Sequence, residues 1–205
     1  MNNPYRLDYP SFRYVKVRDV RSPYKEGADN AGIDFYVPKD LTFEQLKEAN
    51  KNTPTSFRQG TEDLDSIVGF LESVAVQIDT ETGFIERFYI RQGCRLIIPS
   101  GIRGLLDPIG SMLQANNKSG ISTKKGLIFG AEVVDSSYTG EIHIHVINTS
   151  NRIVDIKRDE KLMQFVHIPV FNPTIEEMSM EEFDLITDKW SSRGSGWQGS
   201  TNKNC

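Results

Sequence analysis

Asp135 and Tyr138 place an acid and an aromatic ring three residues apart, in the run Gly130–Glu141. This run reads as a hairpin turn that follows two valines. An aspartate that ends a buried strand can orient and deprotonate a water molecule. A tyrosine just beyond it can present its ring face to a sugar or a base. Asp-Ser-Ser sequences also form ordinary turns, so the run is either a reactive hairpin or a plain one.

The stretch 193–201 reads Arg-Gly-Ser-Gly-Trp-Gln-Gly-Ser-Thr and lies close to the end of the chain. Backbone N–H groups made accessible by glycine, hydroxyls and a guanidinium are the groups that wrap a phosphate chain. The stretch has no hydrophobic periodicity. It is therefore either a polyphosphate-binding segment or a flexible Gly/Ser terminus.

Three further runs carry polar groups in patterns of interest. The run 117–126 has three lysines and three hydroxyls between glycines, as an anion site or a solvated loop would. The run 31–35 reads as a tight turn before a strand that carries Asp34, and 157–165 as a charged turn that enters a strand.

These residues must be positioned by a chain that reads mostly as short strands with Gly/Pro punctuation, which favours a sandwich or barrel of the jelly-roll kind. The predicted strands are 12–17, 73–78, 84–90, 94–98, 142–147 and 162–170. A hairpin loop is expected at 79–83. Thr42-Phe43-Glu44-Gln45 has the form of a capping box, and a weaker helix is expected over Asp63–Glu72. Residues from about 40 to 86 therefore read as an insertion into a β domain.

Composition narrows the classes of function. The 205 residues are 38% hydrophobic and 25% charged, with a formal net charge of −4. This charge argues against nonspecific nucleic-acid binding. No apolar run approaches 18 residues and no signal-peptide pattern opens the chain, so we expect neither a membrane span nor secretion. Two cysteines form no disulfide framework, which favours a cytoplasmic setting.

In order along the chain, the five runs resemble the motifs of the homotrimeric dUTPase family. Ala31-Gly32-Ile33-Asp34 matches the first motif, and Lys118-Ser119-Gly120 with Lys124 takes the second. Asp135, Tyr138 and Gly140 match the third motif. Residues 160–164 take the fourth, and the C-terminal stretch takes the fifth. The resemblance covers about residues 10–38 and 87–201.

The resemblance implies an all-β fold, a distorted jelly-roll β-barrel with a small helical insertion at about 40–86. It implies one domain over 1–190 and a flexible lid over 191–205. It also implies hydrolysis of dUTP to dUMP and pyrophosphate in a homotrimer whose active sites lie at subunit interfaces. The expected cofactor is Mg²⁺, held mainly by the triphosphate with no direct protein ligand. Such chemistry depends on positioning and charge neutralisation, which a mobile lid would complete.

Carried over residue by residue, the resemblance makes Asp135 the base that activates water. Tyr138 would stack under the deoxyribose and exclude a 2′-hydroxyl. The other implied substrate-binding residues are Lys118, Ser119, Gly120, Gly130, Val134, Gln164, Arg193, Trp197, Gly199 and Ser200. Asp34, Lys124 and Lys161 would support them.

The departures from the family pattern leave more than one function open. Lys118 and Lys161 stand where arginines are usual, which keeps charge but loses the bidentate fork. Trp197 would take the stacking role of a phenylalanine after a one-residue shift. A dCTP deaminase of the same fold would carry a glutamate where this chain has His145. A broader pyrimidine nucleotide pyrophosphatase and a non-catalytic nucleotide-binding regulator also fit the pattern. His143 and His145 should share one face of their strand.

Overall fold

Strand β10 (Glu141–Asn148) shows how alternation in the sequence becomes a half-buried strand. Its even-numbered residues are buried and its odd-numbered residues are not, as the period of two requires. His143 and His145 therefore lie on the same face, away from the core, which confirms the expectation from their spacing.

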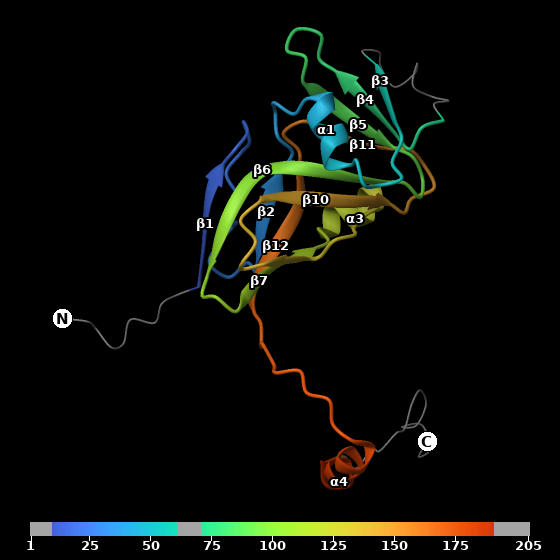
Figure 1. Ribbon diagram of the computed structural model, residues 1–205. Helices are drawn as coiled ribbons and strands as arrows, with labels where there is room; N and C mark the ends of the chain where they lie inside the picture. The colour runs from blue at the N-terminus through green and yellow to red at the C-terminus, as the bar shows by residue number, and fades with distance from the viewer. Residues whose placement is uncertain (1–9, 61–70, 191–205) are drawn as a thin grey trace, which may run out of the picture. The chain divides into compact units, whose positions relative to one another are not determined.

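The computed structural model describes residues 10–60 and 71–190. The chain divides into two compact units, Met1–Val170 and Phe171–Cys205. The first unit contains the strands that the structure describes, and the second contains helix α4 (Met180–Trp190) (Figure 1). In these described ranges no helix combines the length and apolarity that crossing a membrane requires.

Three four-stranded sheets build the first unit. The first has the order β1-β6-β10-β8 and consists of β1 (Ser11–Lys16), β6 (Arg95–Asp107), β10 and β8 (Leu127–Phe129). The second has the order β11-β5-β4-β3 and consists of β11 (Val154–Lys157), β5 (Ile85–Ile90), β4 (Val74–Ile78) and β3 (Phe57–Gly60). The third has the order β2-β12-β7-β9 and consists of β2 (Gly32–Tyr36), β12 (Lys161–Pro169), β7 (Ser111–Asn116) and β9 (Val133–Asp135). The expected all-β class is confirmed.

One hydrophobic core draws residues from all three sheets. Phe35 on β2 meets Phe165 on β12 edge to face, with 4.7 Å between the ring centroids. Ile98 on β6 and Val76 on β4, both fully buried, belong to the same core. Burial of large side chains is the main stabilising term in such a fold. The shared core therefore holds the third sheet, which carries most of the polar motifs, against the other two.

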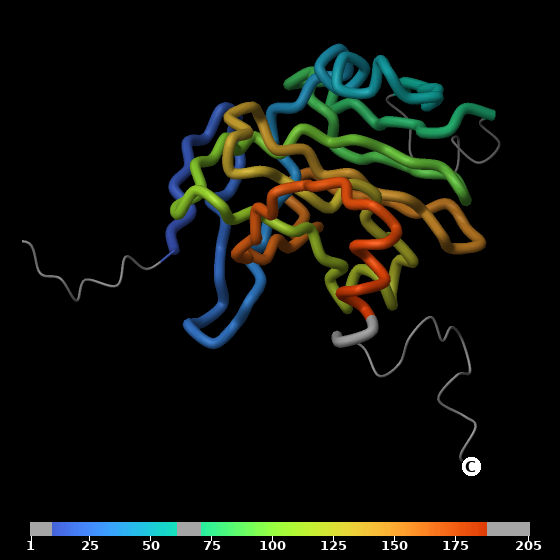
Figure 2. Tube along the Cα trace, turned by 60° about the horizontal axis from the view of Figure 1, so that its bottom comes forward, coloured from blue at the N-terminus to red at the C-terminus, as the bar shows by residue number. Residues whose placement is uncertain are grey.

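The segment read as an insertion begins with the predicted helix, α1 (Phe43–Ala49). The capping box is present, because the Thr42 side chain accepts from the Gln45 N–H and the Gln45 side chain accepts from the Thr42 N–H. At the other end, the buried Asn50 side chain bonds both the N–H and the C=O of Ile97 on β6. In Figures 1 and 2 the helix lies beside β4 and β5 and packs over β6.

The remaining part of the segment that the structure describes contributes strands. Strands β3 and β4 pair in parallel, and β4 and β5 form the expected hairpin, whose loop is closed by the Asp79 side chain accepting from the N–H groups of Glu81 and Thr82. Leu41 and Leu46 are completely buried with the rest of the core. The described part of the segment thus contributes to the fold's own core. Most of the second helix expected at 63–72 lies outside the described residues.

Two helices differ from the sequence expectations. The run 117–126 is not a loop, because α3 (Ser119–Lys125) occupies it and ends at Gly126, whose φ is +69°. A glycine in the left-handed conformation commonly ends a helix. Gly126 is therefore the residue in this lysine-rich run that signals a helix end. Helix α4 is not among the predicted elements, although Ser179 and Glu182 form a capping box at its start.

Candidate active site

A row of polar residues crosses the third sheet where β7, β12 and β2 lie side by side. Gln164 on β12 pairs with Asn116 on β7 and with Asp34 on β2. Directly opposed residues on paired strands present their side chains on one face. The first, second and fourth motifs are therefore brought together by the sheet, although they are distant in sequence.

Asp34 is clamped by the two lysines that replace the expected arginines. Lys118 Nζ lies 2.7 Å from Asp34 Oδ1, and Lys161 Nζ lies 2.9 Å from Asp34 Oδ2. Asp34 is only 6% exposed, so its charge requires partners. The hydrogen bond to Asp34 is the main cause that raises the pKa of Lys161. Each Asp34 oxygen is thus bound by a separate lysine ammonium group, in place of the two-pronged contact that one arginine guanidinium can make.

These residues line a pocket of about 540 Å³. Its lining consists of Glu26, Asn30, Ala31, Gly32, Asp34, Asn116, Asn117, Lys118, Lys161, Gln164 and Val166. Gln164 is held in place by donating to the carbonyl of Asn117, at 3.0 Å. Ser119 and Gly120 are exposed in the first turn of α3, directly after Lys118. Lys124 is exposed in the last turn and is not part of the lining.

The third motif forms a separate pocket of about 210 Å³. Its lining consists of Ala131, Val133, Val134, Asp135, Tyr138, Ile142, His143 and Phe165. Asp135 is exposed at the end of β9, and Tyr138 is 45% exposed. The N–H of Tyr138 donates to the carbonyl of Asp135, which closes the predicted turn. The hairpin therefore presents a carboxylate and an aromatic face to the same hollow.

Gly130 lies at the base of this hairpin and is packed against His145. Its N–H donates to the His145 carbonyl, so this N–H is not free to read a base. A Cβ at position 130 would lie 2.5 Å from the His145 ring, which explains the glycine. Burial is the main cause that lowers the pKa of His145, and the charge of Arg95 acts in the same direction. A neutral imidazole therefore packs under the hairpin.

Strand β7 separates the two pockets within one chain. Asn116 at one end of β7 belongs to the polar row, while Met112 at the other end pairs with Asp135. Four residues along a strand span about 13 Å. The carboxylate that could activate water is thus displaced from the pocket that could hold phosphate.

The larger pocket has a balanced set of charges. Two lysines, Lys118 and Lys161, face two carboxylates, Glu26 and Asp34, so the formal charge of the lining is zero. Within the ranges that the structure describes, no group of three or more His, Cys, Asp or Glu residues could hold a metal ion. Both Asp34 oxygens accept hydrogen bonds from lysines, whereas the Glu26 carboxylate is exposed and could serve as a metal ligand. This donor set fits Mg²⁺ that is bound through phosphate oxygens and water, as the ion prefers.

The structure thus brings Asp34, Lys118, Lys161 and Gln164 together and places Val134, Asp135 and Tyr138 in a second group. It adds Glu26, Asn30 and Asn116, which the sequence did not indicate, and it places Asn117, His143 and Phe165, which lie in the runs noted above, in the linings. Asn116 directly precedes the run 117–126, and this position next to a polar motif is a signal for it. Glu26 lies in an irregular segment with no such signal. Arg193, Trp197, Gly199 and Ser200 lie outside the described residues.

A mostly β scaffold with an oxygen-rich pocket that carries two lysines, and with an Asp/Tyr hairpin, has the groups needed to bind and hydrolyse a phosphate compound. The model of the dUTPase family matches residues 85–197. The chain is 30% identical over 155 residues to the deoxyuridine 5'-triphosphate nucleotidohydrolase of Candida albicans, covering 72% of this chain and 94% of that protein.

Solved structures give the same fold at low identity. The dUTPase of Staphylococcus bacteriophage 80alpha with dUPNHPP superposes with a TM-score of 0.61 at 14% identity, over 93% of this chain and 97% of that one. A mutant dUTPase of phage phi11 of S. aureus, described with a structural Mg(II) ion, gives 0.54 at 14% identity, over 84% and 99%. The chain belongs to the dUTPase family.

Proposed function

We propose that this chain hydrolyses dUTP with Asp135 as the base that activates the attacking water. The overall activity is that of the family, conversion of dUTP to dUMP. The observation that supports the residue roles is the division of polar groups into two pockets, one that carries two lysines and one with an acid beside an aromatic ring. A triphosphate needs the first, and a sugar with a reacting α-phosphate needs the second.

In this proposal Lys118, Lys161 and Gln164 bind phosphate oxygens. The lysines are already oriented by Asp34, so they require little ordering when the substrate arrives. Asp135 accepts a proton from the water that attacks the α-phosphate, and pyrophosphate leaves. Tyr138 stacks under the deoxyribose, and Val134 contributes an apolar wall beside the base.

Mg²⁺ would be held mainly by the triphosphate, with Glu26 as the exposed carboxylate of this pocket, and it would supply neutralisation of charge on the leaving pyrophosphate. In this proposal the stretch 193–201 would form a lid over the substrate. Arg193 and the Gly/Ser residues would contact the phosphates, and Trp197 would lie over the base. A mobile lid excludes bulk water from the reaction.

The separation of the two pockets along β7 leads us to propose a homotrimer with composite sites. The phosphate pocket of one subunit would face the Asp135 hairpin of a second, because about 13 Å of strand divides them within one chain. The lid would come from the third subunit of the trimer.

Pyrophosphate release from dUTP and Mg²⁺ tests the proposal directly. Asp135→Asn should abolish turnover while dUPNHPP still binds. A mixture of Asp135→Asn subunits with Lys118→Met subunits tests the composite site. Both variants are inactive alone, and mixed trimers should regain part of the activity because some sites combine two intact halves. Full activity of Asp135→Asn, or no recovery on mixing under conditions where subunits exchange, would contradict the proposal.

A further inference from the structure

The backbone carbonyl of Glu141 holds the Tyr138 ring in place. Tyr138 Oη donates to this carbonyl at 2.9 Å. The ring lies over Gly140, where a Cβ would come within 2.5 Å of the hydroxyl. The height of the ring above the hairpin is therefore set by where the main chain runs at Glu141.

The Glu141 side chain is itself fixed by three hydrogen bonds. Arg18 Nε donates to Oε1 at 2.8 Å and Arg18 Nη2 donates to Oε2 at 3.0 Å, a bidentate arrangement. The N–H of Gly101 donates to Oε1 at 2.7 Å. The Arg18 and Glu141 side chains are only 15% and 18% exposed. Partly buried bidentate pairs are the stronger kind of ion pair and hold both geometry and charge.

These bonds fall where the ladder between β10 and β6 is irregular. Glu141 pairs with Arg103, but His143 pairs with Pro99, so β6 has extra residues between these pairs. Gly101 lies within this irregularity with φ at +76°. The Glu141 carboxylate takes the Gly101 N–H at a point where the strand register shifts. Without it, a backbone donor at a bulge would need another partner.

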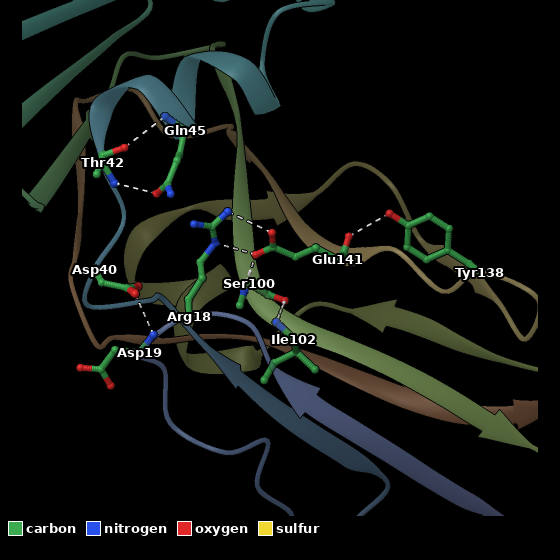
Figure 3. A network of polar contacts seen from close by, with 10 residues as sticks. Arg18, Asp19, Asp40, Thr42, Gln45, Ser100, Ile102, Tyr138 and Glu141 are labelled. Carbon is green, nitrogen blue, oxygen red and sulfur yellow. Dashed lines mark hydrogen bonds and ion pairs between the residues drawn. The ribbon is translucent and has the colours of Figure 1, made fainter.

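The residue next to Arg18 is bonded to the segment that precedes helix α1. Asp19, next to Arg18, donates its N–H to Asp40 Oδ2 at 2.9 Å, and Lys39 donates its N–H to the Asp19 carbonyl at 2.7 Å. Helix α1 begins shortly after Asp40. Figure 3 shows Tyr138, Glu141 and Arg18 joined by hydrogen bonds, and beside them the separate bond from the N–H of Asp19 to Asp40, just before this helix.

We infer that Arg18 and Glu141 are a positioning pair that sets selectivity for the 2′-deoxy sugar. The pair fixes the carbonyl that anchors the Tyr138 ring, and the ring then leaves no room for a 2′-hydroxyl. The inference rests on the proposed role of Tyr138 as the sugar platform. Neither Arg18 nor Glu141 needs to touch the substrate, so a loss of the pair acts through the ring.

The test compares kcat/KM for dUTP and for UTP in Glu141→Gln, which keeps the shape of the side chain and removes its charge. The UTP to dUTP ratio should rise by about tenfold, because a charge-assisted hydrogen bond is weakened to a neutral one. Arg18→Lys, which keeps the charge but loses the fork, should give an intermediate rise and serves if Glu141→Gln folds poorly. Arg158→Gln is the control. This substitution breaks the ion pair between Arg158 and Asp79, which does not involve the hairpin. The two side chains are 29% and 22% exposed, so the pair is buried to a degree similar to Arg18 and Glu141. The substitution should leave the ratio unchanged.

Tyr138→Ala separates the inference from the proposal on which it rests. If Tyr138→Ala raises the UTP to dUTP ratio while Glu141→Gln and Arg18→Lys do not, the positioning role is wrong and the platform stands. If Tyr138→Ala leaves the ratio unchanged, the platform and the pair's role both fall. A loss of thermal stability in Glu141→Gln with an unchanged ratio would show a purely structural ion pair.

Discussion

The Gln164 side chain lies directly against Gly32, in the space that a side chain at position 32 would occupy. A Cβ at position 32 would lie 2.5 Å from Gln164 Oε1 and 3.1 Å from Gln164 Cδ. A side chain at position 32 of the first motif would therefore push aside the amide of the glutamine in the fourth motif, across the pair of strands β2 and β12.

Gly32→Ala should displace Gln164 and break its 3.0 Å hydrogen bond to the Asn117 carbonyl. We expect kcat/KM for dUTP to fall about tenfold and stability to fall by about 1 kcal/mol. The double variant Gly32→Ala/Gln164→Ala should be no worse than Gln164→Ala alone, since the space is then vacant. Gly27→Ala is the control, because nothing lies within 4 Å of its Cβ position. Additive losses in the double variant would contradict this account.

Removing both lysines that clamp Asp34 should leave a buried carboxylate without a cation. We expect Lys118→Met/Lys161→Met to lose about 3 kcal/mol in urea unfolding. Adding Asp34→Asn should restore much of this stability, because the uncompensated charge is gone. Calorimetry with dUPNHPP should show no recovery of binding in the triple variant. Recovery of both together would mean that the lysines act only in folding.

Removal of Mg²⁺ should weaken triphosphate binding more than added salt does. The lining of the larger pocket has no net charge, so long-range attraction of the substrate by the pocket is small. We expect EDTA to reduce dUPNHPP affinity by about 100-fold and a rise to about 0.3 M NaCl to reduce it by less than about 5-fold. Binding of dUMP, which lacks the pyrophosphate, should change little with EDTA. Strong salt dependence without metal dependence would count against this picture.

Acid should destabilise the fold through its three histidines. Burial is the first cause that lowers the pKa of His143, His145 and His167 from the ordinary value of 6.5. The unfolded chain then binds more protons than the folded one, so this stability is present above about pH 6.5 and is lost as the pH falls through the lower folded pKa values. The unfolding free energy should decrease between about pH 7 and pH 5. His145→Gln should reduce the slope in this range, and an unchanged slope would exclude His145 as a contributor.

The parts of the structure that depend on short-range pattern were accessible from the sequence. The alternation of apolar and polar residues predicted β10 and the shared face of its histidines, and the Thr42/Gln45 capping box predicted α1. The clamp on Asp34 was not accessible, because it depends on β12 pairing with β2 and on the first residues before α3. Glu26 was not accessible either, since its irregular segment has no periodic signal.

The role of Glu141 shows the same limit from another side. Its residue type is ordinary at the start of a strand, and only the register shift against β6 brings the Gly101 N–H to its carboxylate. Tyr138 was singled out by its spacing from Asp135, but the bond from its hydroxyl to a main-chain carbonyl depends on how the turn closes. Spacing found the reactive groups, and tertiary pairing decided what orients them.

The pairing of β4 with β5 bears on any attempt to make a smaller enzyme. Strand β5 lies between β11 and β4, and it carries the buried residues Ile85, Phe88 and Ile90. Cutting out the chain between the first motif and residue 85 would leave β5 with a bare backbone edge and an uncovered apolar face. Such edges recruit strands from other molecules. The trimmed protein would therefore aggregate into inclusion bodies during expression. A minimal version must keep β4 or cover the edge of β5 that β4 protects.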